Sequence, residues 1–168
     1  MPNSRVYFLS MVLLALTACG AERQGADFDL RFIDNMTTHH QSAIDMARAA
    51  EATLTHPETK EFARQIIADQ TKEIDQMKAW RDAWYEGAPS AKSDKIPGMD
   101  MQHEMGGGDS DISFIEMMIP HHQGAIEMAK AALQQAKRPE IKQLAQSIIM
   151  AQDAEIQRMN GWKAAWQK

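Results

Sequence analysis

Two pairs of adjacent histidines set among methionines are the residues of this chain best suited to bind a metal. The thioether sulfur of methionine is a soft, neutral donor that binds Cu(I) or Ag(I) well and Zn(II), Mg(II) or Ca(II) poorly, and imidazole extends such a site to Cu(II). Thioethers form no disulfides, so they keep this ability in an oxidising compartment. The candidate ligands are Met36, His39, His40, Met46, Met118, His121, His122 and Met128.

The spacing of these candidates places each set on one side of a helix. At about 3.6 residues per turn, both histidines of the first set and Met46 fall within about 80° of Met36, on the stripe that should face other helices. The second set has the same spacing. The helices expected to follow carry further donors on their inner stripes, namely Gln70, Glu73, Met77, Gln152, Glu155 and Met159. The sequence therefore predicts that four helices bring imidazole, thioether, carboxylate and amide groups together.

Each candidate ligand also has a purely structural interpretation. A methionine on a helical stripe usually fills core space, a buried histidine is usually hydrogen-bonded, and a duplication copies such residues as readily as ligands. However, two adjacent imidazoles are costly to bury without partners, and a methionine precedes each pair by three residues, within contact on a helix surface. The pattern therefore favours a metal site.

An internal repeat predicts the architecture. Residues 32–80 align without a gap on residues 114–162, and the two anchors read FIDNMTTHHQSAIDMA and FIEMMIPHHQGAIEMA. In each copy, apolar residues recur at helical spacing on both sides of a Pro-Glu turn, which indicates a hairpin of two helices. Thr55 and Glu58 have the spacing of a capping box at the first of these turns.

One such hairpin cannot bury its own apolar stripes. We therefore expect the two tandem hairpins to form an all-α, ferritin-like four-helix bundle. The expected single domain covers residues 28–168, with repeat one at 28–86, a methionine-rich linker at 87–110 and repeat two at 111–168. The linker is long enough to cross the bundle, so a crossover and an up-down connection both stay open.

The two copies differ beside their histidines. Met117 stands where the first copy has Asn35, which makes Met117 a weaker additional ligand candidate and the first site the poorer one. Pro120 replaces Thr38 directly before the second pair, where a proline removes a helical hydrogen bond and kinks the helix. The kink either re-aims the second pair of histidines or has no role.

The linker contains a second candidate metal tract. Met99, Met101, His103 and Met105 lie close together between glycines. An exposed, flexible loop has no core for methionines to fill, so this composition indicates soft-metal binding. A low-complexity spacer is the alternative.

The N-terminus predicts export and a lipid anchor. Residues 1–18 carry one charged side chain and an apolar run too short for a mature membrane helix, as in a secretory signal peptide. The run LTAC ending at Cys19 resembles a bacterial lipobox, so we expect cleavage before Cys19, its acylation and a tether over residues 19–27. Because Gly20 follows Cys19, we weakly prefer the outer membrane as the membrane that anchors this periplasmic protein. The alternative is an ordinary signal peptide with a coincidental cysteine.

Composition excludes several classes of function. The formal net charge of −5 argues against nucleic acid as a partner. Cys19 is the only cysteine, so the body of the protein can form no internal disulfide. After Cys19, no hydrophobic stretch approaches the roughly twenty residues that span a bilayer.

The repeated motifs also carry a family resemblance. HHQSAIDMA and HHQGAIEMA, with the downstream I-I, Gln, E-I, Met and Trp, resemble the DUF305 family over residues 28–166. The resemblance implies a small exported protein with a ferritin-like bundle, and some members are periplasmic copper-binding proteins of the CopM type. It implicates the eight candidate ligands named above in metal binding, and it implies that the methionine-rich segment also takes part.

We therefore expect an exported, lipid-anchored protein that binds Cu(I), and also Ag(I) or Cu(II), for metal tolerance or delivery and is not an enzyme. The membrane and a periplasmic copper-handling protein are its expected partners, and the oligomeric state stays open. One alternative is a di-iron carboxylate oxidase or ferroxidase, but such sites take four carboxylates and only Glu73 and Glu155 suit the inner stripes. The other is a metal-free helical interaction module with structural or pH-sensing histidines.

Overall fold

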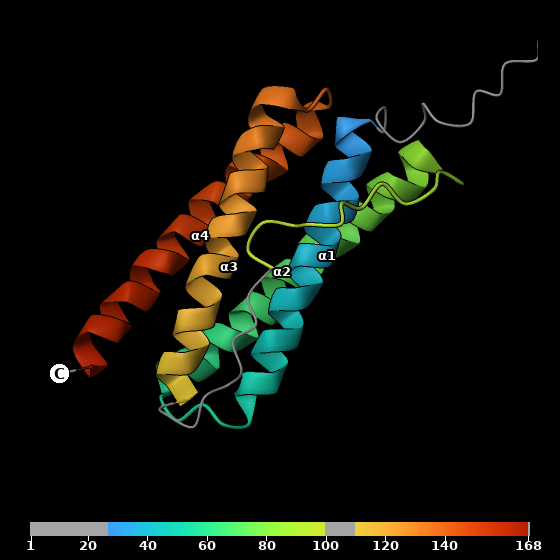
Figure 1. Ribbon diagram of the computed structural model, residues 1–168. Coiled ribbons are helices and arrows are strands. Elements are labelled where there is room, and N and C mark those ends of the chain that lie inside the picture. Colours follow the sequence, from blue (N-terminus) through green and yellow to red (C-terminus); the bar gives the residue numbers. More distant parts are fainter. Residues whose placement is uncertain (1–26, 100–109, 168) are drawn as a thin grey trace, which may run out of the picture.

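Two helical hairpins make up the molecule (Figure 1). The structure, a computed structural model, describes residues 27–99 and 110–167, so the expected signal peptide and Cys19 lie outside the described residues. Its helices are α1 (Phe28–Glu51), α2 (Pro57–Tyr85), α3 (Ser110–Gln135) and α4 (Pro139–Trp166). α1 packs on α2, α3 packs on α4, and the hairpins meet through α1 and α3. The predicted all-α fold of two tandem hairpins is confirmed.

The second helix of each hairpin begins at a proline. Pro57 and Pro139 occupy the first turns of α2 and α4, where a missing N–H costs little. The N-cap of α2 is His56, whose side chain makes no capping hydrogen bond. The capping box expected for Thr55 is wrong, because the Thr55 hydroxyl donates instead to the carboxylate of Asp111, at 2.6 Å.

Each hairpin caps the turn of the other through an aspartate. Asp111, in the first turn of α3, accepts the backbone N–H groups of Thr55 at 2.9 Å and of His56 at 3.2 Å. Asp29, in the first turn of α1, accepts the backbone N–H groups of residues 137 and 138, each at 3.0 Å. Both the aspartates and the turns are related by the repeat (29 to 111 and 55 to 137), so the contacts follow a pseudo-twofold axis.

α2 ends and α3 begins at opposite ends of the bundle. The hydroxyl of Tyr85, at the end of α2, lies 3.2 Å from a carboxylate oxygen of Asp27, the N-cap of α1. α3 begins at the opposite end, where Asp111 contacts the turn between α1 and α2. The connection between α2 and α3 is therefore a crossover, because the two helix ends that it joins lie at opposite ends of the bundle (Figure 1).

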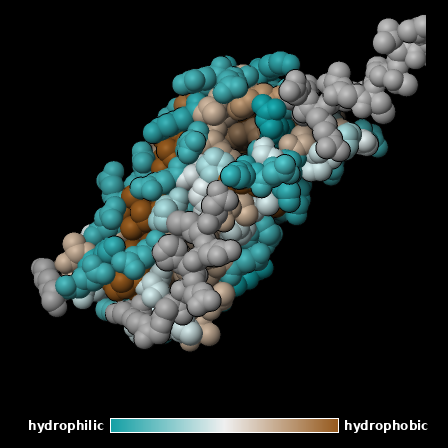
Figure 2. Space-filling model, in the orientation of Figure 1, coloured by the Kyte–Doolittle hydropathy of each residue, from teal (hydrophilic) through white to brown (hydrophobic). Residues whose placement is uncertain are grey.

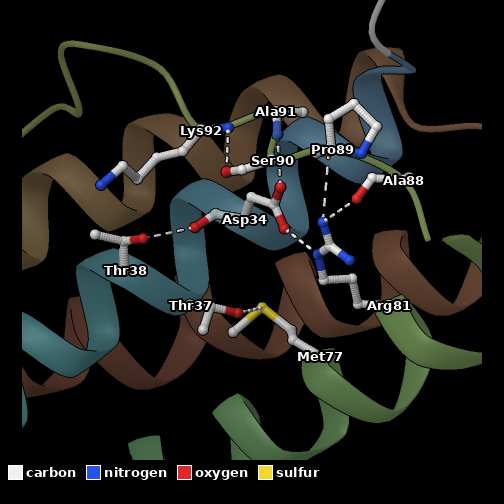
Figure 3. A network of polar contacts seen from close by, with 10 residues as sticks. All are labelled: Asp34, Thr37, Thr38, Met77, Arg81, Ala88, Pro89, Ser90, Ala91 and Lys92. Atoms are coloured by element: carbon white, nitrogen blue, oxygen red, sulfur yellow. Dashed lines mark hydrogen bonds and ion pairs between the residues drawn. The ribbon is translucent and has the colours of Figure 1, made fainter. Parts of the chain in front are cut away.

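The first part of the linker is fastened to α1. The carboxylate of Asp34 accepts the backbone N–H of Ala91 at 2.7 Å and the Nε of Arg81 at 2.8 Å (Figure 3). The amide oxygen of Asn35 accepts the N–H of Ser93 at 2.8 Å. These bonds hold the linker along one side of α1.

The linker then passes directly over α3 at two glycines. A β-carbon at Gly124 would lie 2.3 Å from the carbonyl oxygen of Pro97, and one at Gly98 would lie 2.9 Å from that of His121. Gly98 also has a φ of +78°, which other residues rarely adopt. α3 itself continues through Pro120 as one helix. The linker thus covers the seam of α1 and α3 at the level of the histidines.

The surface is mostly polar. Hydrophilic residues cover most of the face in Figure 2, with hydrophobic strips on the side of α3 and α4. Within residues 27–99 and 110–167, no helix combines the length and apolarity needed to cross a membrane.

Candidate metal centre

The four paired histidines form a layer between two apolar clusters. His39, His40 and His122 are fully buried and His121 is 2 % exposed. One cluster lies at the end of the bundle where α1 begins, and the other lies where α3 begins. The clusters close the histidine layer to solvent along the bundle axis.

His39 of α1 and His121 of α3 bring the two hairpins together. Their ring centroids are 3.8 Å apart, with the ring planes tilted by 38°. Neither nitrogen of either ring makes a hydrogen bond of ordinary geometry with the described protein atoms. Each unsatisfied buried polar group lowers the free energy of unfolding by about 1–3 kcal/mol. This pair therefore destabilises the core unless a further ligand binds to it.

His40 and His122 each contact a carboxylate from the second helix of their own hairpin. The Nε2 atom of His40 lies 2.6 Å from Glu73 Oε2, and that of His122 lies 2.7 Å from Glu155 Oε2. An ionised carboxylate only accepts hydrogen bonds, so Nε2 carries the proton and a neutral ring keeps its lone pair on Nδ1. Both Nδ1 atoms are buried without a partner. A carboxylate on the far nitrogen is the usual support of an imidazole metal ligand.

Burial keeps the central pair of imidazoles neutral. Burial, reinforced by the imidazoles of His121 and His40, lowers the pKa of His39 from 6.5 to about 2. Burial, with His122 and His40 adding to it, lowers the pKa of His121 to about 3. Because protons compete with metal for the imidazole lone pair, this pair keeps its lone pairs available in a mildly acidic medium.

The predicted methionine ligands divide between the two apolar clusters. Met36 and Met128 belong to one cluster, while Met118 belongs to the other and Met46 packs half-buried against it. The repeat relates Met36 to Met118 and Met46 to Met128, so each cluster takes one methionine from each hairpin. Thioether groups therefore lie on both sides of the histidine layer.

Four inner side chains belong to this environment although the predicted ligand set omits them. Glu73 and Glu155 hold the histidines, and Met77 and Met159 are fully buried in the two clusters. The hydroxyl of Thr37 approaches the Met77 sulfur at 3.9 Å (Figure 3). The signal for all four is their place on the inner stripes and their recurrence at the same interval as the histidine pairs.

The donor groups lie close together, but they do not surround a single point. Among the described residues, no three His, Cys, Asp or Glu side chains are arranged to enclose one ion. Coordination would require the tilted rings of His39 and His121 to turn. The donor set itself, imidazole nitrogen with thioether sulfur, suits a soft ion. The predicted convergence of the histidines is observed, while their role as ligands stays a prediction.

Of the linker candidates, Met99 alone falls in the described part of the chain, and Met101, His103 and Met105 lie outside it. Met99 is half-buried and packs against the cluster at the start of α1, next to the buried Ile96. The expectation that the linker methionines have no core to fill is therefore wrong for Met99.

The difference between Asn35 and Met117 has a structural reason. Asn35 exchanges two hydrogen bonds with Ser93, the second from its amide Nδ2 to the Ser93 hydroxyl at 3.0 Å, and so fixes the linker. Met117 is 8 % exposed within α3. That the second site is the better one stays a prediction.

Comparison with known sequences identifies the family. The chain matches the family model "Domain of unknown function (DUF305)" over residues 21–110 and again over residues 111–168. Uncharacterized protein L153 of Acanthamoeba polyphaga mimivirus is 48 % identical over 50 residues, which cover 30 % of this chain. That match spans 33 % of the viral protein, about a third of its length.

Solved structures share the fold. CopM in its Cu(I)-bound form is 41 % identical, with a TM-score of 0.74 over 83 % of this chain and 98 % of CopM. CopM co-crystallised with Ag gives a TM-score of 0.73 at the same identity and coverage. A DUF305 protein from Streptomyces coelicolor is 27 % identical, with a TM-score of 0.75 over 83 % of this chain and 93 % of its own. Sequence and structure agree that this chain belongs to the DUF305 family.

Proposed function

We propose that this protein binds Cu(I) and Ag(I), and also Cu(II), and holds the metal for tolerance or delivery without catalysing a reaction. One observation carries the proposal. In the buried histidine layer, both ring nitrogens of His39 and His121 and the Nδ1 atoms of His40 and His122 lack hydrogen-bond partners among the described residues. A soft metal ion would bind the free lone pair of each ring, which the apolar clusters around the rings cannot do.

The chemistry around the layer supports a monovalent ion. The fully buried Met36 and Met118 lie one turn before the two histidine pairs and supply neutral sulfur donors. Met46 and Met128 add one further sulfur donor from each hairpin, and each of them belongs to or packs against one of the two apolar clusters. Imidazole and thioether leave the charge of the metal uncompensated, and a buried charge needs a counter-charge nearby, which the Glu73 and Glu155 carboxylates can provide.

The similarity to CopM points to the same ions. CopM has been seen in Cu(I)-bound, Cu(II)-bound and Ag-bound forms. This chain is 41 % identical to the Cu(I)-bound form over the aligned region, which covers 98 % of CopM.

Cu(I) should raise the melting temperature of the mature protein under reducing conditions. A ligand that binds only the folded state stabilises it by about 2.7 kcal/mol at a free concentration 100-fold above its Kd. For a domain of this size that corresponds to about 5–10 °C. The measurement is a thermal melt with Cu(I) buffered by a chelator, together with the metal content per chain. Mg(II) should give no shift, and a curve indifferent to excess Cu(I) would refute the proposal.

We also propose that the protein is exported and held at the cell envelope through an acylated Cys19. Replacing Cys19 with serine should leave an uncleaved or soluble form, because the anchor needs the thiol and the new N-terminus. Membrane fractionation and intact mass spectrometry measure this directly. Wild-type protein found wholly in the soluble periplasm without acyl chains would contradict the proposed anchor and leave the metal site untouched.

A further inference from the structure

The described residues cover the histidine layer along the bundle axis and at the seam of α1 and α3. The apolar clusters close it along the bundle axis. On the side of α1 and α3, Pro97 and Gly98 of the linker lie against the α3 backbone at His121 and Gly124. The helices of each hairpin pack closely on one another, whereas α2 and α4 do not. The side between α2 and α4 is therefore one place where an ion could approach.

A polar groove lies on that side. Its narrow floor, about 40 Å³, is lined in part by Gln70, Glu73, Gln152 and Glu155. The two glutamines are 5 % and 3 % exposed, and the Oε1 atom of each is buried with no hydrogen-bond partner among the described residues. The two glutamates are 23 % and 18 % exposed, and each touches a histidine of the layer. Oxygen donors thus connect solvent to the imidazoles, and two of them lack a partner.

The half of the groove beside Glu155 is closed by an arginine. The guanidinium of Arg158 lies 4.6 Å over the ring of Phe62 and donates to the Oε1 atom of Gln65 at 3.3 Å. Arg158 belongs to α4 and both of its partners belong to α2, so its side chain bridges the groove. Its positive charge also opposes the approach of a cation.

The half beside Glu73 is open. The repeat places Gln76 at the position that corresponds to Arg158 (76 to 158). A hollow of about 430 Å³ lies there, lined by Gln76, the carboxylates of Glu73 and Glu140, and other residues of α2 and α4. None of the residues that line it is cationic. The pseudo-symmetric molecule therefore has one blocked and one accessible approach to its histidines.

We propose that this open half of the groove is the port through which Cu(I) or Ag(I) reaches the histidine layer, an inference that rests on the proposed metal binding. The carboxylates attract the cation by their charge. Glu73 both borders the hollow and contacts His40 at 2.6 Å, so an ion at this carboxylate is one side chain away from the first imidazole. Oxygen donors hold a soft ion only weakly, which lets it pass on to nitrogen and sulfur.

Two substitutions at one position test the port. Gln76→Arg copies the blocked half onto the open one, and Gln76→Phe fills the hollow without adding charge. Both should slow the uptake of Ag(I) about tenfold or more, because the arginine repels the cation and the phenylalanine ring narrows its passage. Release from Gln76→Phe should slow by the same factor, leaving its equilibrium affinity unchanged. Stopped-flow tryptophan fluorescence with silver nitrate in chloride-free buffer measures the rates.

Matched variants complete the test. Ala68→Arg adds the same charge at an exposed position of α2 that lines neither the groove nor the hollow, and should take up Ag(I) at the wild-type rate. Arg158→Gln opens the second half and should take up Ag(I) at least as fast as the wild type. A wild-type uptake rate in a folded Gln76→Phe protein would overturn the port. Wild-type protein that binds no Ag(I) at equilibrium would instead refute the proposed function, and the port with it.

Discussion

Leucine in place of both His39 and His121 should give an apo protein that is more stable than the wild type and binds Cu(I) far more weakly. The two rings are buried, and their nitrogens have no hydrogen bond of ordinary geometry. Leucine removes these unsatisfied groups, each of which costs about 1–3 kcal/mol, and fills much of the same space. We expect the free energy of unfolding to rise by about 1–3 kcal/mol, and Cu(I) affinity to fall at least tenfold, about 1.4 kcal/mol.

The matched double variant is His40→Leu with His122→Leu. These two rings contact Glu73 and Glu155, so their removal leaves two partly buried carboxylates without their partners. This variant should also lose Cu(I) affinity, but its apo protein should be less stable than the wild type. Denaturant unfolding and competition with a Cu(I) chelator give both quantities. Destabilisation of the His39 and His121 variant would show that these two histidines are structural.

The same variant should change how stability depends on pH. The pKa of His39 falls from 6.5 to about 2 on folding, and that of His121 falls to about 3. The unfolded chain therefore binds protons that the folded chain does not, so the wild-type free energy of unfolding declines as the pH drops from about 6.5 towards 3. Replacing both histidines with leucine should make this decline shallower. An identical slope would mean that the two rings already titrate in the folded protein.

The sequence could predict the helices and their inner faces because two kinds of information reinforce each other. The apolar spacing in each copy indicates helices, and the repeat shows that the pattern is not accidental. Both histidine pairs and the inner carboxylates of Glu73 and Glu155 could be placed on this basis. Which histidine meets a carboxylate could not be predicted. Adjacent residues differ by about 100° around a helix, and the helix that each one faces depends on how the hairpins dock.

Contacts between distant segments account for the rest. The crossover depends on where α3 starts, and the sequence allows either end. In the sequence, Asn35 stands out only because it lacks the sulfur of Met117. Its structural role is a hydrogen bond with Ser93, which lies 58 residues along the chain. The closed and open halves of the α2–α4 groove come from Arg158 and Gln76, which look like ordinary surface residues because exposed positions carry no periodic signal.

Alanine in place of Asp111 should be the most destabilising single change in the described part of the molecule. The Asp111 side chain is fully buried and accepts the backbone N–H groups of Thr55 and His56 and the hydroxyls of Thr55 and Thr59. Its loss strands these donors at the contact between the two hairpins. Breaking a buried hydrogen-bond network is among the few single changes whose cost reaches about 4–5 kcal/mol, so we expect a loss of about 3–5 kcal/mol, or about 10 °C in Tm.

Asp29→Ala is the matched control, because the repeat places Asp29 at the equivalent position with only two backbone N–H partners among the described hydrogen bonds. It should cost less than Asp111→Ala. Cu(I) affinity should hold in both folded variants, since both aspartates lie at the ends of the bundle. Equal losses from the two substitutions would mean that the threonine hydroxyls at Asp111 contribute nothing.

Asp111→Asn removes the charge of the carboxylate and one of its two acceptor oxygens, and the pH dependence of stability separates these two losses. Burial alone would raise the pKa of Asp111, but the hydrogen bonds from Thr55 and Thr59 hold it below its ordinary value of 3.8. Because the folded pKa is depressed, the stability due to the charge is present above pH 3.8 and is lost as the pH falls through the folded pKa. The wild type should therefore exceed Asp111→Asn in stability near neutral pH, and the gap should narrow in acid. A gap that stays constant down to the acid limit would show that the difference comes from the lost acceptor oxygen and not from the charge.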